Sequence, residues 1–141
     1  MKKFIGFALL VISIIIVSSC GNHMAEETEN TILTEEMVKT TYTQITAEQA
    51  KELMEHESEY VILDTRTQAE YDESHIPGAI LLPDYEVAEK AQSVLLDKEQ
   101  LILVYCRSGR RSKIASQILA DLGYSNVKEF GGIMDWPYDV E

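Results

Sequence analysis

The sequence predicts a small α/β domain in which about five parallel strands form a central sheet with helices on both faces. Two observations support this fold class. Beyond the first third of the chain, short apolar runs alternate with amphipathic segments of helix length, as in parallel sheets with crossover helices. The run 101–105 is apolar throughout, which is typical of a strand covered on both faces. The chain has 141 residues, 45% of them hydrophobic, and this suits one small core.

The first segment has the features of a targeting sequence. Lys2-Lys3 precedes an apolar run of 14 residues at 4–17, which is short for a membrane span of about 20 residues and typical of a signal peptide. Residues 17–20 (VSSC) resemble a bacterial lipobox, so we expect a lipoprotein signal peptide at 1–19 and lipidation of Cys20. Two acyl chains attach a protein stably to a bilayer, so we expect an extracytoplasmic protein that is anchored to the cell membrane. A plain secretory signal and an uncleaved anchor are the alternatives.

Residues 20–41 are predicted to form a flexible acidic tether behind the lipidated N-terminus, because they carry five glutamates and show no apolar periodicity. The folded domain is then expected at 42–141. The formal net charge is −12, and loss of the leader leaves 10 basic against 24 acidic residues. A surface of this charge makes nucleic acid an unsuitable partner, and we expect a monomer.

The first half of the domain contains three predicted strands, at 42–45, 60–63 and 80–82. Thr46 and Gln49 have the spacing of a capping box for a helix that ends near Glu55. A shorter helix is expected at 67–72. The first helix should bury a stripe of three apolar residues, namely Ala50, Leu53 and Met54.

The second half is predicted to contain two longer helices around the strand 101–105. The first begins after Pro83-Asp84, and the second ends before Gly123. Each should bury one apolar face, composed of Val87, Ala88, Ala91, Val94 and Leu95 in the first helix and Ile114, Ala115, Ile118, Leu119 and Leu122 in the second. A last strand is expected at 127–130, then a short helix starting at Gly131-Gly132, with Trp136 in the core.

Cys106 directly follows the apolar strand and is therefore expected at the carboxyl end of a parallel strand, where open α/β sheets bind ligands. The turn 107–111 must lead into a helix N-terminus, where converging backbone N–H groups form an anion-binding nest. These donors and the helix dipole favour a thiolate, so Cys106 is the candidate nucleophile. The alternative is a thiol buried in the core.

Basic residues crowd the segment that follows Cys106. They favour both the thiolate and an anionic substrate, and Gly109 permits backbone geometry that a side chain would block. The alternative is a solvated turn. The four basic residues are Arg107, Arg110, Arg111 and Lys113.

Residues 106–112 (CRSGRRS) resemble the active-site loop of single-domain rhodaneses, the sulfurtransferase family. Three further stretches agree. Residues 64–79, with Asp64-Thr65-Arg66, Glu70-Tyr71 and HIPGA, resemble the family's upstream signature, and 131–136 (GGIMDW) resemble its C-terminal signature. Residues 45–50 (ITAEQA) resemble its opening strand and helix. The resemblance covers 42–138 with the motifs in the family's order.

The resemblance implies the rhodanese fold and sulfur transfer through a persulfide on Cys106. A small-molecule donor, thiosulfate or a persulfide, would supply the sulfane sulfur, and a thiol or cyanide would accept it. The substrate-binding positions would be Arg107, Ser108, Gly109, Arg110 and Arg111. Supporting roles fall to Asp64, Arg66 and Ser112; a helix cap and a surface salt bridge are the alternatives for Asp64 and Arg66. For His75 we expect a structural hydrogen bond rather than a base.

Other reaction classes stay open. Cysteine-dependent phosphatases place their arginine one position further from the cysteine than Arg111 is from Cys106, and the shorter loop here favours sulfur over a phosphate tetrahedron. A non-catalytic binding or redox-sensing module is the main alternative, followed by a phosphatase or an arsenate reductase. No cofactor or metal is expected, because the three histidines are scattered. With Cys20 lipidated, Cys106 would be the only free thiol, which suits a reactive role.

Overall fold

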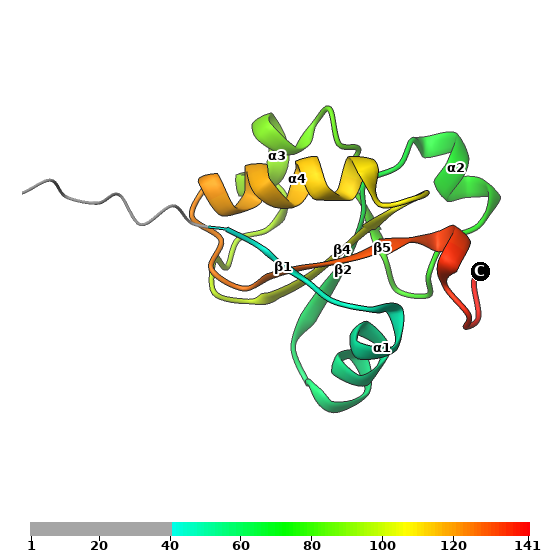
Figure 1. Cartoon of the computed structure of the whole chain (residues 1–141). Helices are drawn as coiled ribbons and strands as arrows, with labels where there is room; N and C mark the ends of the chain where they lie inside the picture. The colour runs from blue at the N-terminus through cyan, green and yellow to red at the C-terminus, as the bar shows by residue number, and fades with distance from the viewer. Residues whose placement is uncertain (1–40) are drawn as a thin grey trace, which may run out of the picture. The chain divides into compact units, whose positions relative to one another are not determined.

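The computed structural model describes residues 41–141, so the predicted leader and all but the last residue of the predicted tether lie outside the described part. Strands and helices alternate along this domain (Figure 1). The elements are β1 (Thr43–Gln44), α1 (Ala47–His56), β2 (Tyr60–Asp64), α2 (Gln68–Glu73), β3 (Ile80–Leu81), α3 (Val87–Val94), β4 (Leu101–Cys106), α4 (Arg110–Asp121), β5 (Val127–Gly132) and the 3₁₀ turn η1 (Ile133–Asp135).

The described residues form a five-stranded sheet in the order β1-β5-β4-β2-β3, with every neighbouring pair parallel. The predicted fold class is therefore confirmed. β4 lies at the centre, and all six of its residues are buried, as the apolar run 101–105 predicted. β1 and β3 lie at the two edges. Because all strands run the same way, the loops that follow β2 and β4 emerge at one edge of the sheet.

Helices cover both faces of the sheet (Figure 1). α3 and α4 lie over one face, where Ile102 and Val104 of β4 pack with Ala115 and Leu119 of α4. α1 and the C-terminal segment lie over the other face, where alternate β4 residues pack in a second core. The second core includes Ala50, Leu103, Tyr105, Phe130 and Trp136, so the predicted core position of Trp136 is correct.

Local capping explains where two helices begin. Thr46 and Gln49 form the predicted capping box at α1, with each side chain bonded to the other's backbone N–H. Thr67 and Glu70 form a second capping box at α2. Among the residues that the structure describes, no helix is both long and apolar enough to cross a bilayer.

Several predicted core positions are wrong. Val94, the last residue of α3, is 44% exposed, and Ala88 is also exposed. The buried row of α3 is Val87, Ala91 and, just beyond its end, Leu95, spaced four residues apart, and Ala88 lies about 100° around the helix from Val87. Ile114 is 48% exposed.

The buried face of α4 is centred on Ser112, Ala115, Ser116 and Leu119. This face therefore includes two serines and excludes Ile114, which apolar periodicity had placed on it. Gly131-Gly132 also differs from the prediction, because these residues continue β5 and the following turn begins only at Ile133.

Candidate active site

Cys106 is the last residue of β4, in the middle of the sheet, and only 1% of it is exposed. The chain leaves the strand there and turns directly into α4. Gly109, the N-cap of α4, makes this sharp turn with φ of 91°, a left-handed conformation that glycine adopts without strain. The structure thus places Cys106 where the sequence predicted it, at the carboxyl end of a parallel strand and beside a helix N-terminus.

Hydrogen-bond donors converge on the sulfur. The backbone N–H of Gly109 donates to Cys106 Sγ at 3.1 Å. Burial alone would raise the pKa of the Cys106 thiol, but the hydroxyl of Ser112 and the backbone N–H groups of Ser112, Ser108 and Gly109 outweigh it, and the pKa is lowered from its ordinary value. The loop therefore stabilises the thiolate, as the sequence led us to expect.

Gly132 supports the loop from below. Its backbone lies against Arg107 and Ser108, so that a Cβ atom at Gly132 would lie 2.5 Å from the Arg107 carbonyl carbon and 2.6 Å from Ser108 Cα. β5 reaches this position through an irregularity in its pairing with β4, after which Gly132 pairs with Cys106. The backbone of β5 at Gly132 thus sets how closely the active loop packs against the sheet.

Arg111 is held by an acidic residue that sequence reasoning assigned no role. Its two terminal nitrogens donate to the two carboxylate oxygens of Glu70, both at 2.8 Å. This pairing holds the pKa of Glu70 at about 2 and, with a contribution from the Cys106 thiolate, raises that of Arg111. Glu70 is itself fixed in the capping box with Thr67. The pair therefore joins the start of α4 to the start of α2.

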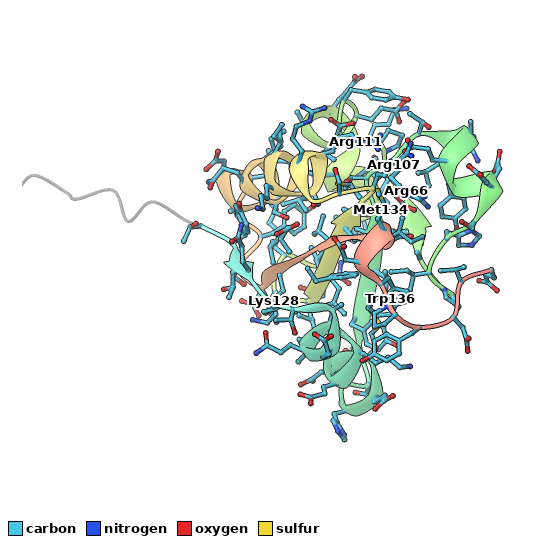
Figure 2. The ribbon with its side chains drawn as sticks, turned by 45° about the vertical axis from the view of Figure 1, so that its right-hand side comes forward. Arg66, Arg107, Arg111, Lys128, Met134 and Trp136 are labelled. Atoms are coloured by element: carbon cyan, nitrogen blue, oxygen red, sulfur yellow. The ribbon has the colours of Figure 1, made fainter. Side chains whose placement is uncertain are left out.

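The other predicted cationic residues remain available to a ligand. Arg107, Arg110 and Lys113 are exposed, and no ion pair involves them among the described residues. Arg107 borders a depression of about 170 Å³ with Glu70 and Met134. Figure 2 shows Arg107, Arg111 and Met134 in the same upper part of the view, with Lys128 below and to the left of them. The depression lies beside the active loop, and its lining combines Arg107 and Arg66 with the carboxylates of Glu70 and Glu73.

Asp64 and Arg66 form a buried network rather than a surface salt bridge. Asp64 accepts hydrogen bonds from the Arg66 guanidinium at 2.6 to 3.0 Å and from the Tyr105 hydroxyl at 2.6 Å. Arg66 also donates to the Ser74 carbonyl oxygen, and the Ile76 N–H donates to Tyr105. The network thus ties the segment after α2 to the residue that precedes Cys106.

His75 lies in this same segment and makes structural contacts. Its ring stacks on Tyr71 with centroids 3.8 Å apart, and Nδ1 is 3.0 Å from the Tyr71 carbonyl oxygen. Its backbone pairs with that of Glu141 in both directions. These contacts fit the hydrogen-bonding role expected from the sequence.

Ser112 and Glu129 make up the layer beneath the loop. The Ser112 hydroxyl donates to Glu129 Oε1 at 2.6 Å, and the Gly131 N–H donates to the same oxygen at 2.9 Å. Glu129 is 2% exposed, and sequence reasoning missed it. A carboxylate inside the predicted strand 127–130 was the signal that could have identified it.

The described residues offer no group of three or more His, Cys, Asp or Glu that could hold a metal ion. A larger cavity, of about 420 Å³, lies between α1 and the C-terminal segment and is lined by Met54, Trp136 and Tyr138. Its lining contains no cysteine, and the thiol of lowered pKa lies in the Cys106 loop instead.

A family model described as "Rhodanese-like domain" matches residues 46–137, nearly two-thirds of the chain. The chain belongs to the rhodanese family. As a rhodanese it is a sulfurtransferase-like enzyme, and the matched segment contains the whole loop around Cys106 and the residues that support it.

Curated relatives carry the same domain. The thiosulfate sulfurtransferase PspE of Escherichia coli (strain K12) is 38% identical over 73 residues, which are 52% of this chain and 70% of PspE. The thiosulfate sulfurtransferase GlpE of Coxiella burnetii (strain RSA 331 / Henzerling II) is 35% identical over 96 residues, covering 67% of this chain and 87% of GlpE. Some relatives are much longer, since the match covers only 22% of the adenylyltransferase and sulfurtransferase UBA4 of Meyerozyma guilliermondii.

Solved structures agree with the rhodanese fold. A rhodanese with anions from E. coli superposes with a TM-score of 0.55 at 34% identity, over 58% of this chain and 96% of that one. A rhodanese-related protein from Thermoplasma volcanium superposes with a TM-score of 0.62 at 31% identity, over 71% of this chain and 98% of that one. In both cases nearly the whole neighbour is matched.

Proposed function

We propose that this rhodanese moves a sulfane sulfur from thiosulfate or a persulfide to a thiol or cyanide, with Cys106 as the carrier. The observation that supports this most strongly is the buried Cys106 sulfur with the N–H of Gly109 at 3.1 Å and a lowered pKa. A lowered pKa favours the thiolate, which is the nucleophilic form of cysteine and needs no separate base. The names of PspE and GlpE make thiosulfate a reasonable donor to test first.

The reaction would proceed in two displacements. The Cys106 thiolate attacks the outer sulfur of thiosulfate, the S–S bond breaks, and sulfite leaves with the electron pair. The terminal sulfur of the persulfide then lies among the loop N–H groups, which stabilise its negative charge in both halves of the cycle. Attack by a thiol or cyanide on that sulfur returns the electron pair to Cys106 and regenerates the thiolate.

The arginines of the loop would have two different roles. Arg111 is committed to Glu70 through two hydrogen bonds and therefore shapes the loop. Arg107 and Arg110 are exposed and would attract the anionic donor and its leaving group. The matched E. coli rhodanese was solved with anions, which is consistent with an anion site in a protein of this fold.

The same pairing argues against phosphate chemistry. Arg111 is the loop arginine nearest the position at which cysteine-dependent phosphatases place theirs, and both of its terminal nitrogens bond Glu70 instead of being free for phosphate oxygens. A module that only binds a partner would have no use for a thiol of lowered pKa. A redox-sensing cysteine is typically solvent-accessible, whereas Cys106 is 1% exposed, so we favour the enzyme.

Steady-state kinetics on the full chain test this proposal. Thiosulfate with cyanide should give ping-pong turnover, an aryl phosphate should give none, and Cys106→Ser should abolish sulfur transfer while the circular dichroism spectrum is unchanged. Turnover of the aryl phosphate would support the phosphatase alternative. No turnover with thiosulfate or with any persulfide donor would support the binding module.

We further propose that the chain is a lipoprotein whose domain works outside the cytoplasm, attached to the cell membrane through Cys20. The support is the sequence alone: a positive start, an apolar run of 14 residues and the lipobox-like 17–20. These positions lie outside the described residues. Sulfur donors and acceptors would then have to be present at the membrane surface.

A further inference from the structure

The depression beside the active loop has a lining that neither thiosulfate nor cyanide explains, because neither carries a positive charge or an apolar part. Its volume is about 170 Å³, below the roughly 300–1,000 Å³ of sites that hold drug-sized molecules. The lining consists of Arg66, Glu70, Glu73, Ser74, Arg107, Ile133 and Met134. A ligand of this depression would therefore be small and would meet charges of both signs and an apolar surface.

Two of the four charged side chains in the lining are already neutralised within the protein. The guanidinium of Arg66 donates to the carboxylate of Asp64, and the pair is buried. Both carboxylate oxygens of Glu70 accept hydrogen bonds from Arg111. Neither Arg66 nor Glu70 therefore offers an uncompensated charge to a ligand.

The other two charged side chains, Arg107 and Glu73, are free to bind a ligand. Both are exposed, and within residues 41–141 no ion pair or side-chain hydrogen bond involves either of them. They do not pair with each other, although both line the same depression. The depression thus presents one free cation and one free anion, together with the apolar side chains of Ile133 and Met134.

The depression lies next to the residue that would carry the transferred sulfur. Arg107 directly follows Cys106 in the chain, so their Cα atoms are about 3.8 Å apart. The Met134 N–H donates to the Arg107 carbonyl oxygen at 3.3 Å, and Gly132 pairs with Cys106. Met134 is 68% exposed, and Figure 2 shows it close to Arg66 and Arg107, which line the depression with it.

We propose that this depression binds the sulfur acceptor, and that the acceptor is a small thiol with both an ammonium and a carboxylate group, as a free amino acid has. The carboxylate would bind Arg107, whose planar guanidinium can donate two parallel hydrogen bonds to it. The ammonium group would donate to Glu73, and the short aliphatic part would contact Met134. The inference rests on the proposed sulfur transfer and names the class of its acceptor.

The step that this ligand would perform is the second displacement of the cycle. The thiol loses its proton, and its sulfur attacks the outer sulfur of the Cys106 persulfide. The bond between that outer sulfur and Cys106 Sγ breaks, and the electron pair returns to Sγ as the thiolate. The outer sulfur leaves bonded to the amino acid, whose new persulfide takes up the proton that the thiol gave up, so the net charge is constant.

The first test compares L-cysteine with 3-mercaptopropionate, which is cysteine without its ammonium group. Sulfite release from thiosulfate by the full chain gives kcat/KM for each acceptor, and in a ping-pong reaction this quantity reports the second displacement. Glu73→Gln should lower the ratio of the two values about fivefold relative to wild type. The different intrinsic reactivities of the two thiols cancel in this comparison. Asp72→Asn, one residue earlier on α2, exposed and outside the depression, is the matched control and should leave the ratio unchanged.

The second test compares L-cysteine with cysteamine, which is cysteine without its carboxylate. Arg107→Gln should lower this ratio about tenfold. Arg110→Gln removes an exposed arginine of the same loop that does not line the depression, and the ratio should stay at its wild-type value. A change of less than twofold in either the Glu73 or the Arg107 variant, or an equal change in its control, would overturn the proposal.

A third measurement needs neither a variant nor turnover. L-Serine has the same two charged groups but no thiol, so it should bind without reacting. In an NMR titration of the full chain it should shift the Met134 methyl signal at lower concentrations than 3-hydroxypropionate, which lacks the ammonium group. Equal titrations would overturn the proposal. Absence of sulfite release with every acceptor would instead overturn the proposed sulfur transfer, and the serine titration would then decide alone whether the depression binds an amino acid.

Discussion

At the scale of single residues, the Glu70–Arg111 pair is the contact that orders the active loop from outside. The two side chains are about one-fifth exposed and are joined by two hydrogen bonds of 2.8 Å, the geometry in which arginine and carboxylate interact most strongly. Glu70 also caps α2. Its removal should therefore affect both stability and the position of α4.

Glu70→Gln should lower the free energy of unfolding at pH 7 by about 1–2 kcal/mol, less than the full pKa shift would give, because the pair is partly exposed. The pKa of Glu70 in the folded domain is about 2, below the ordinary 4.5. Its stabilisation is therefore complete above pH 4.5 and is lost as the pH falls towards 2. Urea unfolding at several pH values measures this.

The difference between wild type and Glu70→Gln should accordingly shrink as the pH approaches 2. Glu89→Gln, an exposed carboxylate on α3, serves as the control and should change stability little at any pH. A Glu70→Gln deficit that persists unchanged at acid pH would show that the ion pair is not its cause.

Side-chain contacts could be predicted from the sequence only where the two partners lie close together along the chain. Thr46 and Gln49 lie three residues apart, and their capping box was predicted correctly. Glu70 lies 41 residues from Arg111, and Ser112 lies 17 from Glu129. Such pairs depend on which helix N-termini and strands the fold brings together, so no spacing rule could identify them.

At the scale of elements, the active loop is a strand–turn–helix unit resting on β5. Apolar periodicity located β4 and α4 well, because buried strands and amphipathic helices have distinct patterns. It misplaced the centre of the buried face of α4, where Ser112 and Ser116 lie against the sheet instead of Ile114. Near an active site, polar residues can occupy core positions, and a hydrophobic pattern cannot detect them.

Gly132→Ala tests the support that β5 gives to the loop. The backbone of Gly132 is extended, with φ of −130° and ψ of 154°, so alanine would be acceptable there except for its contact with Arg107 and Ser108. We expect displacement of the loop and a fall of about 100-fold in sulfur transfer, the cost of a misplacement of about 1 Å.

Gly78→Ala is the matched control for this change. Gly78 has φ of 80°, so alanine is strained there, yet its Cβ would meet nothing within 4 Å. This variant should lose about 1 kcal/mol of stability and retain activity. Wild-type kinetics for Gly132→Ala would show that the loop does not rest on β5 as described.

At the scale of the whole molecule, the loop is a basic site on an acidic domain. The described residues contain nine basic and nineteen acidic side chains, and four of the nine lie between Arg107 and Lys113. An anionic donor would be repelled by most of the surface and attracted to the loop. Composition predicted this contrast directly, because it needs no knowledge of contacts.

The proposed attachment to the membrane is also a property of the whole chain. Cys20→Ala should abolish incorporation of labelled palmitate and leave the precursor uncleaved, because the lipidated sulfur is missing. Cys106→Ala is the control and should incorporate label normally. Undiminished labelling of Cys20→Ala would rule out a lipobox at 17–20.

If Cys106 carries sulfur as a persulfide, mass analysis of the purified chain after thiosulfate treatment will detect it. We expect an increase equal to one sulfur atom on the Cys106 peptide, its removal by cyanide, and no increase in Cys106→Ser. Absence of this adduct with thiosulfate and with thiol persulfides, in a chain whose Cys106 still alkylates readily, would contradict this role of Cys106.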